Sequence, residues 1–354
     1  MDKVVYLTGA GAICAEMEHQ GIESNLSMRG IGSTVSRMSE SRKGPYSILR
    51  KNFSIPQDQD IEVILSLLEG HKGLDLSPFK TVCPELRQLF REYLLTEING
   101  KSLVPKIHNS LLHIHNKYGP NMGENGESLL GILTLNYDSI LDAAFHDIYG
   151  IIDYGYITTP PQEKPHSKVP LLLKMHGSFN WCIEKDELAV SGKFEQLDYK
   201  DKCTGWMPPS VYKKPHEKVF PELWEKASNL LTECDVLRVL GCSLRSEDFA
   251  LISLIFSAQV MSKPFRIELI VPDTEVLGRE GDAVNPSPKV GMMQRLPFLG
   301  NMQNLSSLTE YKEDSYRSQN PLKSWVLMKL AQIEKNIGHS LDDELINSNL
   351  MLGG

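Results

Sequence analysis

The sequence lacks the long apolar segments that would assign it to a membrane or to the secretory pathway. No apolar run approaches the roughly 18 residues that a membrane-spanning helix needs. The first apolar run, residues 4–7, ends at Gly9 and is too short for the apolar part of a signal peptide. We therefore expect a cytoplasmic protein with no membrane partner.

An excess of positive charge is also lacking. The 354 residues carry a formal net charge of −8, which argues against a protein built mainly to bind nucleic acid. Hydrophobic residues make up 41% of the chain and charged residues 23%, which is typical of a globular protein with a sizeable core. The composition predicts one large domain or two smaller ones, and no direct nucleic-acid partner.

No two of the six cysteines form a CxxC pair. Their spacing fits neither a disulfide framework nor a zinc module, so we expect buried, reduced thiols and no bound metal. The six positions are Cys14, Cys83, Cys182, Cys203, Cys234 and Cys242.

Short apolar runs alternate with helical stretches along the chain. Continuous apolar runs of this length suit strands that are buried on both faces of a sheet. The expected strands cover residues 4–7, 130–135, 171–175, 236–240 and 267–271. The expected helices lie near residues 60–70, 84–97, 103–117, 139–149, 221–233, 247–261 and 321–337. This alternation predicts an α/β fold with a Rossmann-like, mostly parallel sheet.

Several stretches interrupt the alternation. Residues 24–47 are rich in Ser, Gly and Arg and are expected to form a mobile loop. Residues 56–128 are mainly helical in pattern and too long for one crossover, which predicts a helical insertion. Residues 276–303 have a loop-like composition, and the tail from 338 to 354 is expected to be loosely ordered.

A glycine-rich turn, Thr8-Gly9-Ala10-Gly11, follows the first expected strand. Glycines let the backbone turn tightly and approach a diphosphate, whose charge a helix N-terminus favours. Cys14 stands where the dehydrogenase fingerprint G-x-G-x-x-G has its third glycine, so hydride transfer is not indicated. Nucleotide binding and an ordinary tight turn both remain open.

Polar residues follow two further strands. Asn136 and Asp138 come after the strand at 130–135, and His176 comes after the strand at 171–175. Ligands of open α/β sheets lie beyond the carboxyl ends of the strands, so these side chains are expected to face one cleft. Asp138 could instead cap the next helix, and a lone His is often structural, although His suits acid–base chemistry near neutral pH.

The last two expected strands end in residues that could hold a ribose or a phosphate. Gly241 and Ser243 follow the strand at 236–240, and Asp273 follows the strand at 267–271. An acid in the last position could bond the ribose of an adenosine. The alternative for Gly241 and Ser243 is a turn followed by a helix cap.

The order of these motifs resembles the sirtuin NAD-binding fold. The phrases TLNYDSILD, KMHGSFNW and VLGCSLRSEDFALISLIFSA are most similar to bacterial sirtuin-like NAD hydrolases of antiphage defence. The resemblance covers roughly residues 3–275. It implies a catalytic domain over residues 1–275, including the insertion, and a C-terminal extension over 276–354 that could serve assembly.

The resemblance also implies roles for individual residues, with NAD as the substrate. Asn136 would position the attacking water near the nicotinamide ribose, Asp138 would help to hold that end of NAD, and His176 would be the catalytic base. The remaining cofactor contacts would come from Gly9, Ala10 and Gly11 at the phosphates and from Gly241, Ser243 and Asp273 at the adenosine.

Two departures from the sirtuin pattern bear on which reaction the protein is expected to catalyse. The interval 179–235 holds only three cysteines and no CxxC pair, so the zinc module of sirtuin deacylases is expected to be absent. Ile13 stands where the family turn usually has a Ser, which puts one phosphate contact in doubt. The preferred hypothesis is an NAD hydrolase that releases nicotinamide and ADP-ribose during abortive infection.

Alternatives on the same fold remain open. They are a sirtuin-like deacylase or ADP-ribosyltransferase, and a non-catalytic sensor of NAD or ADP-ribose. Because loss of NAD harms the host cell, we expect control by assembly. The expected assembly is a homo-oligomer or a complex with a partner such as a HerA-type ATPase.

Overall fold

The computed structural model describes most of the chain. The described residues are 1–23, 26, 28–69, 77–99, 103–119, 126–156, 158, 169–184, 187–190, 205–209, 219–242, 244, 248–261, 265–270, 309–310 and 320–337. The stretches 276–303 and 338–354, expected to be loop-like and loosely ordered, lie outside them. No helix in the described part of the chain is long and apolar enough to cross a membrane.

One parallel sheet organises the structure, with strand order β3-β2-β1-β6-β7-β8. Its strands are β1 (Asp2–Thr8), β2 (Glu127–Thr134), β3 (Leu171–Lys174), β6 (Val236–Leu240), β7 (Arg266–Ile270) and β8 (Thr309–Glu310). All five expected strands are present, so the expected mostly parallel α/β fold is confirmed. A small antiparallel hairpin, β4 (Trp181–Glu184) with β5 (Glu187–Val190), was not expected.

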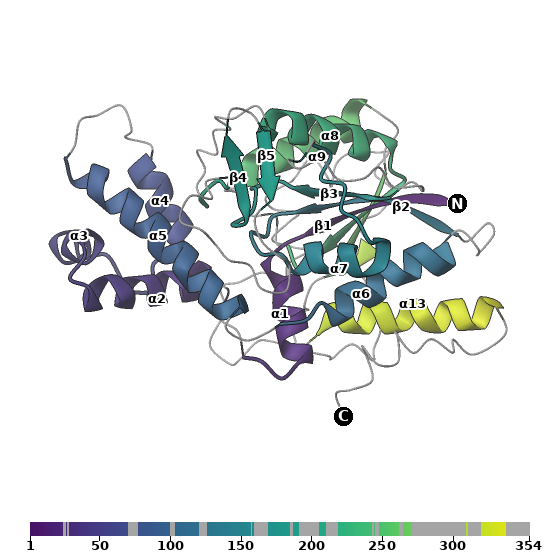
Figure 1. Cartoon of the computed structure of the whole chain (residues 1–354), viewed down its shortest axis with the longest axis horizontal. Coiled ribbons are helices and arrows are strands. Elements are labelled where there is room, and N and C mark those ends of the chain that lie inside the picture. The colour runs from purple at the N-terminus through teal and green to yellow at the C-terminus, as the bar shows by residue number, and fades with distance from the viewer. Residues whose placement is uncertain are drawn as a thin grey trace.

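Helices cover both faces of this sheet (Figure 1). Helix α8 (Val219–Glu233) packs on β1, β2 and β3, with α9 (Phe249–Met261) beside it. The other face carries α1 (Ala10–His19), α6 (Lys106–His113), α7 (Ile140–Tyr149) and α13 (Pro321–Ile337). The strand order reverses between β1 and β6, and a reversal of this kind opens a ligand crevice at the carboxyl ends of the strands.

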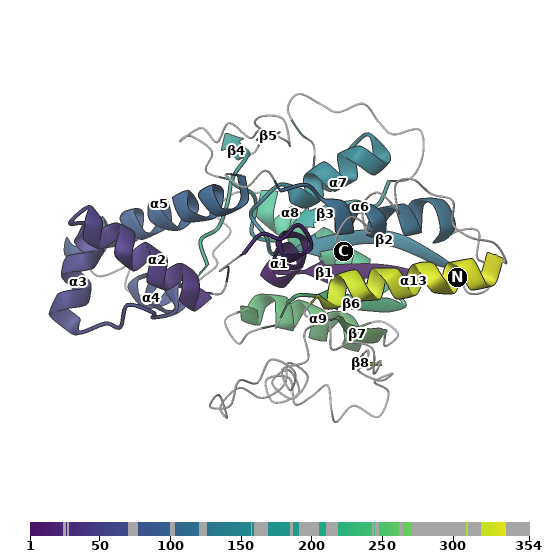
Figure 2. The same ribbon diagram turned by 90° about the horizontal axis from the view of Figure 1, so that it is seen from below.

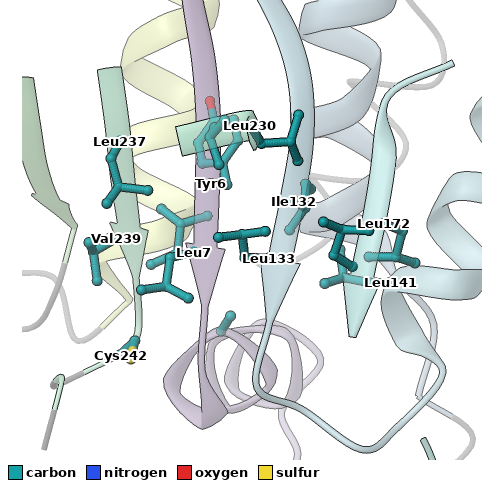
Figure 3. Close-up of a cluster of buried hydrophobic side chains, with 14 of the residues drawn as sticks. Tyr6, Leu7, Ile132, Leu133, Leu141, Leu172, Leu230, Leu237, Val239 and Cys242 are labelled. Carbon is teal, nitrogen blue, oxygen red and sulfur yellow. The ribbon is translucent and has the colours of Figure 1, made fainter. Parts of the chain in front are cut away.

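Apolar side chains from neighbouring strands form the main core. Figure 3 shows Val239, Leu7 and Leu133 side by side across the sheet, and all three are fully buried. Burial of each such side chain contributes roughly 1.5–3 kcal/mol. Trp325 of α13 also lies in this core, 6.0 Å from Tyr6 between ring centroids. The inner face of α13 therefore belongs to the main core, although α13 follows residue 275.

A second core lies beside the sheet, in the group of helices at one end of the molecule in Figures 1 and 2. Its helices are α2 (Met28–Ser41), α3 (Pro45–Phe53), α4 (Ile61–Glu69) and α5 (Ser77–Asn99). This helical group spans residues 28–99, so it begins before the expected insertion 56–128, and α6 within that range packs in the main core instead.

The expectation of a mobile loop over residues 24–47 is wrong, because α2 and the start of α3 occupy most of that stretch. Ile31 and Val35 lie one turn apart and are both buried, which is the spacing of a helix face. Ser39, which gave the segment its loop-like composition, donates a hydrogen bond to Glu85 Oε1 of α5 at 2.8 Å. Helix α1 also lies outside the expected helices.

A buried polar network joins strands β1, β2, β6 and β7. Arg238 of β6 is 1% exposed and donates to Glu268 Oε2 and Glu127 Oε2, both at 2.7 Å. Its Nη1 also donates to the hydroxyl of Tyr6 at 3.1 Å, and that hydroxyl lies 2.7 Å from Nε2 of His115. His115 belongs to the π-helix η1 (Ile114–Tyr118). Burial lowers the pKa of His115 to about 3, so the ring is neutral and can accept from Tyr6.

The burial of His115 predicts that the stability of the protein decreases as the pH is lowered. A histidine in the unfolded chain takes up its proton near pH 6.5, whereas His115 does so near 3. The contribution of neutral His115 to the stability of the fold is therefore complete above pH 6.5 and is lost as the pH falls toward 3. When the pH is lowered from 6.5 to 5, the free energy of unfolding should fall in both proteins. The fall should be about 2 kcal/mol smaller in the variant His115→Gln than in wild type. Urea titrations across this range measure the difference, and equal pH slopes in the two proteins would contradict the assignment.

Candidate functional site

Two glycine turns meet at the strand reversal, after β1 and after β6. The Gly9 N–H donates to the carbonyl of Leu240 at 3.1 Å, and the Gly11 N–H donates to the carbonyl of Gly241 at 2.9 Å. Gly241 has a φ of +54°, and a Cβ on it would lie 2.4 Å from the Ala12 nitrogen. The sequence uses glycine here because the two backbones touch. Gly9–Gly11 therefore form a tight turn, which both interpretations of this motif require.

The N-terminus of α1 lies at this junction. The helix begins at Ala10 with no acidic residue in its first turn, so its positive end is not neutralised locally. Ile13 is 1% exposed within the second core and offers no polar group to a phosphate. Thr8 is fully buried, and its hydroxyl has no hydrogen-bond partner among the described residues.

Asn136 connects this junction to the end of β2. Its Nδ2 donates to the carbonyl of Gly9 at 3.1 Å, although 127 residues separate the two in sequence. Its backbone N–H donates to Thr134 Oγ1 at 3.2 Å, which fixes the direction of the chain as it leaves the strand. Asn136 retains 9% exposure. The fold therefore brings together the first two motifs identified in the sequence.

Asp138 lies just before Ser139, the N-cap residue of α7, so it is not itself the N-cap. Its Oδ1 accepts a hydrogen bond from the Ile140 N–H at 2.9 Å and so pairs one amide of the first helical turn. Burial raises the pKa of this carboxyl above its usual range, and the positive charge of Lys174 opposes that effect only in part.

His176 occupies the turn after β3, beside the loop that carries Asn136. The ring centroid of His176 lies 5.9 Å from that of Tyr137. The backbone carbonyl of His176 accepts from the Met207 N–H at 2.9 Å. Its neighbour Gly177 has a φ of +74° and pairs with Trp206 in an antiparallel bridge. His176 as a whole is 6% exposed.

An aromatic cluster that the sequence analysis did not identify supports this region. Tyr137 stacks on Phe179 with ring centroids 5.0 Å apart, and Trp206 packs edge-on against both rings. Phe90 of α5 stacks on Trp206 at 6.2 Å, so the helical insertion packs directly on the loops of the candidate site. Arg91 Nη2 also donates to the carbonyl of Phe179 at 3.4 Å.

The remaining sequence-based candidates divide into two groups. Gly241 lies at the junction, whereas Ser243 and Asp273 lie outside the described residues. Within the described residues, no group of His, Cys, Asp and Glu side chains could hold a metal ion. Cys182 is disulfide-bonded, so the expectation of reduced thiols is wrong at that position. Cysteine pairing depends on proximity in the fold, which the spacing along the chain does not reveal.

Comparison with known proteins identifies part of this region. Residues 130–263 match the model of a family described as the SIR2-like domain. The matched stretch contains Asn136, Asp138, His176 and Gly241, whereas the turn at 9–11 precedes it. No curated protein matches the sequence.

Several solved structures are similar at low identity. One is a SIR2 homolog–NAD complex, with 15% identity over 75% of this chain and 77% of that chain, at a TM-score of 0.38. Another is Sir2Tm bound to a propionylated peptide, with 15% identity over 84% of this chain and 92% of that chain, at a TM-score of 0.36. A third is a Sir2 homologue mutant in complex with ADP-ribose, with 14% identity over 96% of this chain and 95% of that chain, at a TM-score of 0.40.

The turn at Gly177 gives a direct test of this geometry. A Cβ at Gly177 would lie 2.1 Å from the Gly205 carbonyl oxygen, whereas a Cβ at Gly150, where φ is +72°, would meet nothing within 4 Å. Gly150→Ala should therefore cost only the backbone strain, about 1 kcal/mol. Gly177→Ala should cost about 3 kcal/mol or more, because backbone must also move. Urea unfolding measures both losses of stability, and equal losses would show that the turn is not packed as described.

Proposed function

We propose that this chain, through its SIR2-like domain, binds NAD as a substrate and cleaves the nicotinamide–ribose bond to give nicotinamide and ADP-ribose. The observation that carries the proposal is the hydrogen bond from Asn136 Nδ2 to the carbonyl of Gly9. It puts an amide against a glycine turn at the strand reversal, with His176 on the adjoining loop. A nucleotide diphosphate and a reactive ribose would need groups of these types at one edge of the sheet.

The chemistry of the bond fits this small set of groups. The nicotinamide–ribose bond is glycosidic, and its cleavage passes through an oxocarbenium-like state. The leaving group is already a pyridinium, so it departs neutral and needs no general acid. The protein therefore has three tasks in this reaction. It must hold the ribose, stabilise the positive charge that develops on it, and position a nucleophile.

Each role then falls to a residue at the strand ends. Asn136 orients a water molecule toward the ribose carbon, and His176 accepts a proton from that water as the bond breaks. Asp138 helps to hold the nicotinamide end. Binding contacts come from Gly9, Ala10 and Gly11 at the diphosphate, with the positive end of α1, and from Gly241, Ser243 and Asp273 on the adenosine side.

We further propose that the reaction depletes NAD in antiphage defence by abortive infection, and that assembly restrains it at rest. The assembly would be a homo-oligomer or a complex with a partner such as a HerA-type ATPase. Helix α3 of the insertion exposes Ile48 at 57% and Phe53 at 71%, which supports this surface as one face of the assembly. The C-terminal extension would contribute through the outer face of α13, because the inner face is in the core.

Incubation of the purified protein with NAD, alone and with candidate partners, tests the proposal. Chromatography should show release of nicotinamide and ADP-ribose in equal amounts. Asn136→Ala and His176→Ala should each lower kcat by about 10²–10⁴-fold, because each removes a group that acts on the reacting ribose. Asn109→Ala is a matched control: that buried amide bonds Asp147 at 3.0 Å on α7, so turnover should persist.

Other outcomes would overturn the proposal in distinct ways. Absence of NAD turnover by wild type under every partner condition contradicts a hydrolase. Turnover that requires an acylated peptide indicates a deacylase, and transfer of ADP-ribose to protein indicates an ADP-ribosyltransferase. Tight binding of NAD without any product indicates a sensor.

A further inference from the structure

Lys174 is a buried lysine at the carboxyl end of β3 that has no part in the chemistry above. Its side chain is 1% exposed, and it lies two residues before His176. The two preceding residues, Leu172 and Leu173, are fully buried, so an apolar residue would suit this strand. Burial of an ammonium group costs several kcal/mol unless the charge is paired, so its presence calls for a specific reason.

The contacts of Lys174 join three segments of the chain. Its Nζ donates to the backbone carbonyl of Asp138 and to Asp142 Oδ2, the latter at 2.7 Å. Asp142, on α7, is fully buried and accepts a second hydrogen bond on Oδ1 from the hydroxyl of Tyr154 at 2.5 Å. One ammonium group thus connects β3, the loop that carries Asn136, and the start of α7.

This contact completes a series of bonds between the two catalytic loops. The Met175 N–H donates to the carbonyl of Thr134 at 2.9 Å, and the Phe179 N–H donates to the carbonyl of Tyr137 at 3.1 Å. The Ser178 hydroxyl donates to the carbonyl of Tyr137 as well, at 2.9 Å. His176 lies between the donors, and Asn136 lies between the acceptors. Lys174 adds the bond to the next carbonyl, that of Asp138.

We propose that Lys174 is a positioning residue that sets the spacing between Asn136 and His176, and this proposal rests on the function proposed above. It acts through its hydrogen bond to the carbonyl of Asp138. Its ammonium group is held by Asp142, which Tyr154 holds in turn. The turns at Gly9 and Gly241 are joined by backbone hydrogen bonds of their own, in which Lys174 takes no part. Loss of Lys174 should therefore impair the reacting end of the site and leave the adenosine end intact.

A comparison of three variants tests this role. Lys174→Met should lower kcat for NAD cleavage by about 10–100-fold, with little change in the Kd for ADP-ribose measured by calorimetry. Lys174→Met leaves Asp142 as an uncompensated buried charge, which is destabilising by itself. The double variant Lys174→Met/Asp142→Asn removes that charge and keeps an acceptor for Tyr154. Its Tm should recover, whereas kcat should stay low because the bond to Asp138 is still missing.

Lys329→Met is the matched control. Lys329 pairs with Glu127 Oε1 at 3.0 Å at the opposite end of β2, so this variant should keep wild-type kcat. Recovery of kcat together with Tm in the double variant would show that Lys174 is only structural, and would overturn the proposal. A raised Kd for ADP-ribose with unchanged kcat would also overturn it.

Hydrogen exchange separates this proposal from the proposed function. Without any ligand, the amide of Phe179 should exchange about tenfold faster in both Lys174 variants than in wild type, because the two loops separate more often. If wild type does not cleave NAD, the proposed function fails, and exchange alone then decides the role of Lys174. Unchanged exchange at Phe179 would show that Lys174 does not hold the loops together.

Discussion

At the carboxyl ends of β1 and β6, two turns approach so closely that a methyl group on Gly241 would lie 2.4 Å from the Ala12 nitrogen. This contact places the start of α1 directly over the point where the strand order reverses. The carbonyl of Gly9 then accepts the Asn136 side chain, so the end of β2 is fixed relative to the same junction. The candidate site depends on this backbone contact because each further loop is held, directly or through a neighbour, against it.

A second constraint comes from outside the sheet. Tyr137 and Phe179, from the loops that carry Asn136 and His176, belong to the core of the helical insertion rather than to the main core. Phe90 of α5 packs edge-on against both rings and also stacks on Trp206 beside them. The conformation of the site loops therefore depends on the packing of the helical group that lies beside the sheet. In physical terms, a displacement of α5 would be transmitted to His176 through rings in direct contact.

Much of this arrangement could be predicted from the sequence because its signals are local. The strands are continuous apolar runs, and Asn136 and His176 could be placed at one edge because parallel strands share their carboxyl ends. Helix α2 was missed because its serines form hydrogen bonds inside the fold instead of marking a loop. Phe90 and Trp206 were missed because only tertiary packing brings them to the site. Lys174 carried a usable signal, a charge at the end of an apolar strand, but its partners could not be predicted.

The structure of the protein with bound NAD or ADP-ribose tests the central claim most directly. A crystal structure of the Asn136→Ala variant soaked with NAD would preserve the substrate while the reaction is slow. We expect the diphosphate against residues 9–11, and the nicotinamide ribose between position 136 and His176. A dinucleotide bound away from the reversal between β1 and β6, or no binding at that crevice at saturating NAD, would contradict it.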